Sequence, residues 1–508
     1  MSVMRTKSVE QSIADTEDPE HQLKKDLGAL DLVIFGVGVM IGAGIFILTG
    51  IAAASNAGPA VPLSFLFAGV ACALAALCYA EFASTVPVAG SAYTFSYATF
   101  GELIAWTIGW DLVLEFTIGA SALSVGFSGY LNSLLDGTAF ELPLALQSVS
   151  SADNPDGVFN LAAVLIALVV MGILIAGIKL SSLVNQVVVA IKLAVVAAVI
   201  VGGIGYISAD NYTPFIPPSA SPAAGEAGWL QLPLIQTIFG MEPAVYGFAG
   251  VISGAAIVFF AFIGFDVVAT TAEEARNPQR DVPIGILGSL AIVTVLYMAV
   301  SVVVTGMQSY KNIDPEDEAP LATAFKANGV DWMSDVISIG ACIGLVVVVM
   351  ILMLGQTRVA FAMARDGLLP VGLSKVHPKF GTPHVITMIT GVSVAIIAGL
   401  VDLETLADLV NIGTLFAFIL VSVGVVLLRR SRPDLPRAFR VPAAPVVATL
   451  AVLFCLYLML NLLGETWVRF GIWMLLGFVV YFLYGKSHSR VGQRESEGAP
   501  PPARQEST

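Results

Sequence analysis

The sequence predicts an all-α polytopic membrane protein with twelve transmembrane helices. Of its 508 residues, 57% are hydrophobic and only 12% are charged, whereas a soluble chain carries about a quarter charged residues. A helix needs about 20 apolar residues to cross a bilayer. Backbone groups in hydrocarbon must pair within their own segment, which favours helices. The candidate spans are 29–54, 60–83, 101–130, 159–177, 182–206, 250–270, 283–306, 334–360, 385–401, 406–428, 443–463 and 466–485.

Basic residues are distributed unevenly between the segments that join these spans. With the N-terminus inside the cell, twenty Lys and Arg residues fall in inner segments, whereas only three, Lys311, Lys326 and Arg469, fall in outer loops. The positive-inside rule therefore predicts a multi-pass protein of the cell membrane with both termini in the cytoplasm. Residues 1–27 form a polar N-terminal segment without a signal-peptide pattern. The polar residues 487–508 are predicted to be a disordered cytoplasmic tail.

Several functions are disfavoured by what the sequence contains. All four cysteines lie in apolar spans and lack metal-ligand spacing, so they are interpreted as core residues. The sequence has no phosphate-binding GxxxxGK[ST] loop, and no nucleophile–histidine set can be assembled at membrane depth. The net charge of −13 does not favour nucleic-acid binding. We therefore expect neither an enzyme nor a resident cofactor.

Two of the predicted helices contain interruptions. Gly36–Gly50, "GVGVMIGAGIFILTG", holds five glycines, each of which weakens a helix interior by about 0.5–1 kcal/mol. The sixth span contains "FFAFIGFD", in which Gly264 is followed by Asp266. These spans are five apart and therefore cross the membrane in opposite directions. Interrupted segments in corresponding positions of two halves indicate a transporter built from inverted repeats.

The interruptions have two interpretations. Unwinding at Gly42 and Gly44 would free N–H groups that suit a carboxylate and carbonyl groups that suit an ammonium. A ligand with an α-carboxylate beside an α-amine matches that arrangement. Alternatively, the glycines only allow close packing between helices. The matching interruption in the sixth span favours the binding site.

Several motifs resemble those of amino acid permeases in the amino acid–polyamine–organocation (APC) superfamily. "KKDLGALDLVIFGVGVMIGAGIF" resembles the beginning of these proteins. "YAEFASTVPVAGSAYTFSYATFGEL", residues 79–103, also resembles them. "GWDLVLEFTIGAS" and "FFAFIGFDVVATTAEEARNPQRDVPIGI" resemble the cationic amino acid transporter group, and "RVAFAMARDGLLP" also fits. The similarity covers about residues 24 to 485.

The resemblance implies a core of two inverted five-helix repeats in residues 28–428, with discontinuous helices 1 and 6, and two further helices in 443–486. It also implies alternating access around a site at the membrane midplane. Backbone N–H groups of the first interruption would bind the substrate carboxylate, carbonyl groups of both interruptions would bind the amine, and an aromatic side chain would cover the site. Carried onto this sequence, the substrate-binding residues are Met40, Gly42, Ala43, Gly44, Ile45, Phe260, Ala261, Phe262 and Ile263.

Lys192 is the predicted proton-coupling residue. It lies about ten residues, or about 15 Å, into the fifth span, and desolvation at that depth favours its neutral form. In proton-coupled members of the resembled group, a lysine at this place substitutes for a sodium ion and contacts the broken first helix. We therefore expect its amine to reach carbonyls near Val39 to Gly42. The alternative is a permanently charged lysine in a static ion pair.

Three acidic residues also fall within spans, where charges are costly and functional by default. Glu115 and Asp111 share a face of the third span. Glu115 has four open interpretations: a partner of Lys192, a contact for a basic substrate, a second proton site, or a protonated acid in the core. For Asp111 we favour structural capping, and for Asp266 the stabilisation of N–H groups freed by the sixth-span interruption.

Acidic residues near the span ends have more ordinary interpretations. Glu81 is expected to face arginines of the inner loops. Glu273 and Glu274, with Arg276, are candidates for a cytoplasmic gate. The acidic run 314–318 is expected to be a solvated outer loop.

The leading hypothesis is a secondary active amino acid transporter that takes up substrate with protons by alternating access. The alternatives are an exchanger of basic amino acids or polyamines without net proton coupling, and an amino acid sensor that does not transport. The expected partners are an amino acid, protons and the lipid bilayer. An apolar pocket would suit neutral branched side chains, whereas Glu115 would suit arginine or lysine if it faces the pocket.

Overall fold

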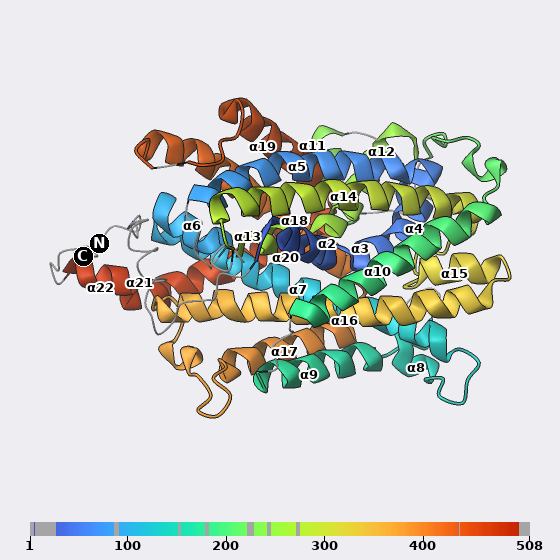
Figure 1. Cartoon of the computed structure of the whole chain (residues 1–508), viewed down its shortest axis with the longest axis horizontal. Coiled ribbons are helices and arrows are strands. Elements are labelled where there is room, and N and C mark those ends of the chain that lie inside the picture. Colours follow the sequence, from blue (N-terminus) through green and yellow to red (C-terminus); the bar gives the residue numbers. More distant parts are fainter. Residues whose placement is uncertain are drawn as a thin grey trace.

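The computed structural model is a bundle of helices (Figure 1). It describes residue 5 and residues 27–85, 91–150, 154–177, 182–220, 228–240, 245–270, 275–435 and 437–496. These residues form helices, turns and isolated β-bridges but no strand. The α-helices are α2 (Ala29–Met40), α3 (Ala43–Phe46), α4 (Leu48–Ala52), α5 (Val61–Thr85), α6 (Ser91–Thr99), α7 (Glu102–Leu135), α8 (Leu144–Gln147), α9 (Leu161–Ile175), α10 (Ser182–Gly203), α11 (Leu234–Phe239), α12 (Gly247–Val258), α13 (Phe265–Thr270), α14 (Pro278–Met307), α15 (Pro320–Ala327), α16 (Asp331–Arg365), α17 (His384–Leu400), α18 (Leu403–Ser431), α19 (Ala444–Leu460), α20 (Gly464–Val480), α21 (Lys486–His488) and α22 (Arg490–Ser496).

The predicted spans coincide with helical segments. Eight helical runs among the described residues are long and apolar enough to cross a membrane. The remaining apolar helices, α2, α9, α17 and α19, have 10 to 17 residues, fewer than the about 20 that a full crossing needs. The α2 helix is short because the chain leaves helical geometry after Met40. The structure therefore supports a polytopic membrane protein.

The centre of the bundle is formed by α2. It packs against α14, α10, α13 and α16, and α7 packs against α16 and α18. Figure 1 shows α6, α21 and α22 at one end of the bundle and α8 and α15 at the other. The central helices are apolar on most faces because they are surrounded by other helices rather than by water.

The beginning of the predicted disordered tail is ordered. Residues 486–496 form α21 and α22. The Arg490 N–H donates to the Asp366 carbonyl at 3.0 Å, and the Ser489 hydroxyl donates to the buried Glu102 carboxylate. Glu102 also accepts a hydrogen bond from Tyr481 at 2.9 Å. These polar contacts explain why a segment of low hydrophobicity is held against the bundle, and residues 497–508 lie outside the described part.

Candidate functional site at two interrupted helices

The first interruption lies between α2 and α3. Ile41 leaves helical geometry, with φ −70° and ψ 91°, and the next helical turn begins at Ala43. The Phe46 N–H donates to the Gly42 carbonyl at 3.3 Å. The first N–H groups of such a turn have no partner within the helix. The interruption therefore falls within the interval that the glycine pattern predicts.

The second interruption lies between α12 and α13. A 3-10 turn covers Phe259–Phe262, Ile263 is extended, and Gly264 has φ +112°. Only glycine adopts that backbone conformation without strain. The Gly264 N–H donates to Asp266 Oδ1 at 3.2 Å. Asp266 therefore satisfies a backbone group freed by the interruption, as the sequence analysis expects.

Tyr297 of α14 joins the two interruptions. Its hydroxyl lies 2.5 Å from the Met40 carbonyl oxygen and 2.8 Å from that of Ala261. A single hydroxyl proton serves one acceptor at a time, so the two carbonyls share it. Sequence reasoning missed this residue. The only signal was a lone tyrosine within an otherwise apolar span.

Lys192 of α10 lies at the end of α2. It is fully buried, and its Nζ donates to the Gly38 carbonyl at 2.7 Å and to the Ile41 carbonyl at 2.8 Å. Gly344 of α16 leaves room for the side chain, because a β-carbon there would lie 2.8 Å from Lys192 Cε. Among the described residues, no ion pair joins Lys192 to Glu115, so the interpretation of Glu115 as its salt-bridge partner is wrong in this conformation.

Asp111 and Glu115 of α7 are buried without strong partners. Within the described part of the chain, neither Asp111 oxygen has a hydrogen-bond partner, nor does Glu115 Oε1. The Thr414 hydroxyl lies within hydrogen-bonding reach of Glu115. The expected capping role of Asp111 is wrong, because neither of its oxygens accepts a hydrogen bond from a described residue and its side chain lies against Gly413 of α18.

The predicted substrate-binding residues gather at the junction of the interruptions. Their side chains are buried, apart from Ala43, whose side chain is not described. Phe262 packs edge-on against Phe65 and Tyr297, with ring centroids 6.5 and 5.4 Å away. The carbonyls of Met40 and Ala261 are not vacant, because Tyr297 already donates to them.

Glu81 forms a charged contact near the α6 end of the bundle. Arg429 donates to it from Nε at 2.7 Å and from Nη2 at 2.5 Å, and Arg437 Nε lies 3.6 Å from Oε1. The Val441 N–H also donates to Glu81, at 2.8 Å. The expected contact between Glu81 and arginines is confirmed. Glu273 and Glu274 lie outside the described residues.

The described residues contain no group of His, Cys, Asp or Glu side chains that could hold a metal ion.

The acidic run 314–318 is only partly solvated. Glu318 is half-buried, and a β-carbon on Gly129 of α7 would overlap its Cβ. This loop therefore packs onto the bundle instead of extending into solvent.

Comparison with known proteins agrees with this architecture. The family model described as amino acid permease matches residues 27–483. The chain is 47% identical to the branched-chain amino acid permease BcaP of Bacillus subtilis (strain 168), over 97% of this chain and 99% of the relative. It is 44% identical to the methylthioribose transporter of the same organism, over 96% and 99%. It is 40% identical to the vacuolar cationic amino acid transporter 4 of Arabidopsis thaliana, over 85% and 68%. The chain that contains these two interrupted helices therefore belongs to the amino acid permease family.

Proposed function

We propose that this protein carries an amino acid across the cell membrane by alternating access and couples uptake to protons. Membership in the amino acid permease family supports a transporter rather than an enzyme. The proposed arrangement has twelve spans, with a five-plus-five inverted-repeat core in 28–428, two further helices in 443–486, and both termini in the cytoplasm. The distribution of basic residues supports that orientation.

The proposed substrate site is the junction of the two interruptions. N–H groups at 43–45 would bind the carboxylate, and carbonyls of Phe260 and Ile263 would bind the amine. The carbonyls of Met40 and Ala261 would become available when Tyr297 moves or shares them. Interrupted helices of this kind carry substrate sites in transporters built from inverted repeats.

A neutral branched-chain amino acid is the favoured substrate. Met40, Ile45, Phe260, Phe262 and Ile263 give the junction an apolar lining, which suits an aliphatic side chain. The similarity to BcaP supports the same substrate class. A cationic substrate is the second candidate, because Glu115 is buried with one oxygen unpartnered among the described residues.

Substrate class is tested by thermal shift of the purified protein with each of the twenty amino acids and methylthioribose. A ligand that binds only the folded state raises the melting temperature. Stabilisation by leucine, isoleucine or valine is expected. Stabilisation by arginine and lysine alone would favour the second candidate, and stabilisation by methylthioribose alone would contradict both.

The proposal of proton coupling rests on one observation: Lys192 Nζ donates to two carbonyls at the end of α2. A protonated amine holds α2 against α10 more strongly than a neutral one, because charge-assisted hydrogen bonds are the stronger kind. Loss of the proton would weaken this contact and allow the first helix to move. The protonated state would therefore favour the arrangement that binds substrate, and deprotonation would favour release inside.

The experiment compares Lys192→Ala with the parent in proteoliposomes. We expect uptake driven by an inward proton gradient to be lost, whereas counterflow with substrate on both sides persists. Lys311→Ala is the control, because Lys311 is exposed and lies outside the junction. Accumulation by Lys192→Ala with the pH profile of the parent would make Lys192 a structural lysine. Strict dependence of the parent on internal substrate would favour the exchanger.

A further inference from the structure

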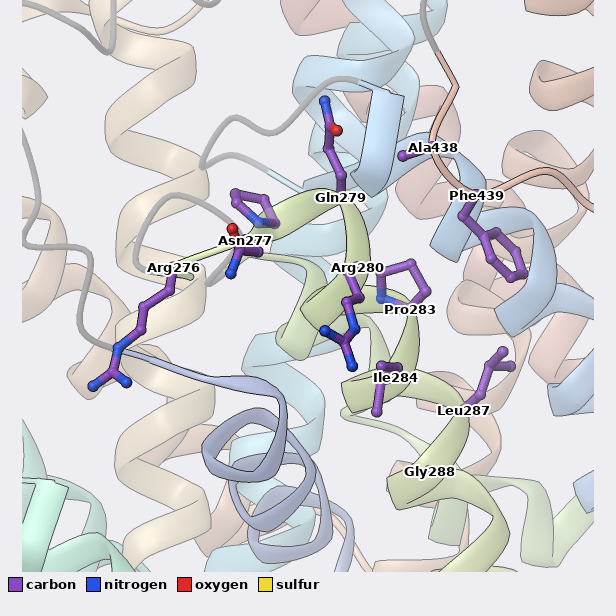
Figure 2. Close-up of a pocket in the computed structure, with 11 residues that line it drawn as sticks. Arg276, Asn277, Gln279, Arg280, Pro283, Ile284, Leu287, Gly288, Ala438 and Phe439 are labelled. Carbon is purple, nitrogen blue, oxygen red and sulfur yellow. The ribbon is translucent and has the colours of Figure 1, made fainter.

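A cavity of about 950 Å³ lies at the beginning of α14. One wall comes from α14 and the residues just before it, and the other from Ala438 and Phe439 in the segment between α18 and α19. Figure 2 shows Arg276 and Arg280 on the α14 side and Phe439 on the opposite side. In the proposed orientation, this cavity opens at the cytoplasmic surface of the membrane.

The α14 wall carries two positive charges. Arg276 and Arg280 are both exposed, and neither forms an ion pair with any residue that the structure describes. Asp281, next to Arg280 in the chain, is only 6% exposed and accepts the Asn277 N–H at 3.2 Å. Glu273 and Glu274, which precede Arg276, lie outside the described residues. By contrast, Arg429 and Arg437 near this end of the bundle share Glu81. The residues that line the cavity therefore include two arginines and no acid.

The next turns of the same wall are apolar. Pro283, Ile284 and Leu287 line the cavity together with Phe439. Ile284 is 42% exposed, and the exposed apolar face continues along α14 at Ile292 and Val295. A continuous exposed apolar face on a membrane-spanning helix faces lipid. The apolar wall thus continues the lipid-facing side of the protein.

The length of α14 places the charges and the apolar wall at different depths. Its 30 residues span about 45 Å, whereas the hydrocarbon core is about 30 Å thick. If the helix is centred, about five residues at each end lie in the headgroup region. Arg276 and Arg280 then lie at headgroup depth, while Ile284 and Leu287 lie beside the acyl chains.

We propose that this cavity binds an anionic phospholipid of the cytoplasmic leaflet. The phosphate lies between Arg276 and Arg280, whose planar guanidinium groups suit bidentate contacts with phosphate oxygens. An acyl chain lies along Ile284 and Leu287 and against Phe439. Two arginines in a lining without acidic side chains favour a lipid with net negative charge over a zwitterionic one. Basic pockets between helices on the cytoplasmic side are suited to anionic headgroups.

The test is native mass spectrometry of the full-length protein, titrated with phosphatidylglycerol or with phosphatidylcholine of the same acyl chains. We expect tighter binding of phosphatidylglycerol, and binding weaker by about tenfold or more in Arg276→Gln/Arg280→Gln, because each charge-assisted contact is worth about a factor of ten. The matched control is Lys375→Gln/Lys379→Gln. It removes the same charge from exposed residues elsewhere, and we expect it to bind like the parent.

A second arm separates a lipid from a free anion. Phe439→Ala should weaken phosphatidylglycerol binding while both arginines remain, and excess glycerol 3-phosphate should not displace the lipid. A thermal shift with phosphatidylglycerol should appear in the parent and be lost in the arginine double variant. Equal binding of the two lipids, equal loss in the lysine control, or displacement by glycerol 3-phosphate would each overturn the proposal.

Discussion

Gly44 in the first interruption lies directly against Ala261 in the second. A β-carbon at Gly44 would overlap both Cα and Cβ of Ala261. At Gly42, by contrast, a β-carbon would meet the side chains of Leu123 at 3.3 Å and Val348 at 3.8 Å. The close contact between the two interrupted helices therefore depends on Gly44, whereas Gly42 leaves more room for a side chain.

The first prediction is that Gly44→Leu prevents uptake and lowers the melting temperature. The new side chain must displace the backbone at Ala261, and overpacking of this kind costs about 1–3 kcal/mol or more. Gly172→Leu on α9 is the matched control, because nothing lies within 4 Å of a β-carbon there. Melting in detergent and uptake in proteoliposomes are measured for both. Parental uptake by Gly44→Leu would show that the two interruptions can separate without loss of function.

The sequence predicted the helices and their interruptions because these depend on local composition. Apolar runs of membrane length give the helices, and glycines at 42, 44 and 264 lie at or beside the interruptions. These features require no knowledge of which helices are neighbours. The depth of Lys192 in its span predicted its burial, whereas its contact with the first interruption was implied by the resemblance to the permease group.

Long-range contacts could not be predicted in the same way. The role of Tyr297 depends on α14 packing against α2 and the second interruption, which no local pattern reveals. The contact of Gly44 with Ala261 has the same origin. The capping role expected for Asp111 was wrong because its side chain lies against α18, and the sequence does not reveal that these two helices are neighbours. Ser489 and Arg490 likewise find partners more than a hundred residues away in the chain.

The second prediction concerns Tyr297→Phe. Removal of the hydroxyl leaves the Met40 and Ala261 carbonyls without this donor, while the ring still packs against Phe65 and Phe262. An unsatisfied buried acceptor costs about 1–3 kcal/mol, so we expect a lower melting temperature and slower uptake. Tyr212→Phe is the control, because it removes a hydrogen bond of 2.6 Å to the Val302 carbonyl on the same helix without touching either interruption. If both variants transport equally well, the bridge at the junction has no role in transport.

The third prediction concerns pH and Glu318, which lines a cavity of about 940 Å³ with Glu316 and Glu404. Burial, together with the nearby Asp317 carboxylate, raises the pKa of Glu318 to about 8. The ordinary value for glutamate is about 4.3, so the folded state binds more protons than the unfolded state between these values. The contribution of Glu318 to the free energy of unfolding is therefore fully present below about pH 4.3 and decreases as the pH rises towards 8.

Melting temperatures between pH 5 and 8.5 check this prediction. The melting temperature of Glu318→Gln should depend less on pH than that of the parent, because the amide does not ionise. The control is Glu141→Gln, since Glu141 is exposed in a nearby loop. An unchanged pH dependence in Glu318→Gln would mean that Glu318 is solvated and ionised throughout this range.

The last prediction separates Glu115 from Asp111, which lie one helical turn apart on α7. Both are buried, but only Glu115 lies within hydrogen-bonding reach of a hydroxyl, that of Thr414. An unpaired ionised carboxylate is costly in such surroundings, so replacement by the isosteric amide should leave the melting temperature at or above that of the parent. Glu115→Gln cannot exchange a proton, however. We therefore expect its proton-driven uptake to fall by about tenfold or more, equivalent to about 1.4 kcal/mol, with a flatter pH profile.

Asp111→Asn is the control and should retain most of the parental uptake, because the Asp111 side chain packs against Gly413 without a polar partner among the described residues. If Glu115→Gln keeps both the rate and the pH profile of the parent, Glu115 is a protonated acid of the core, and proton coupling rests on Lys192 alone.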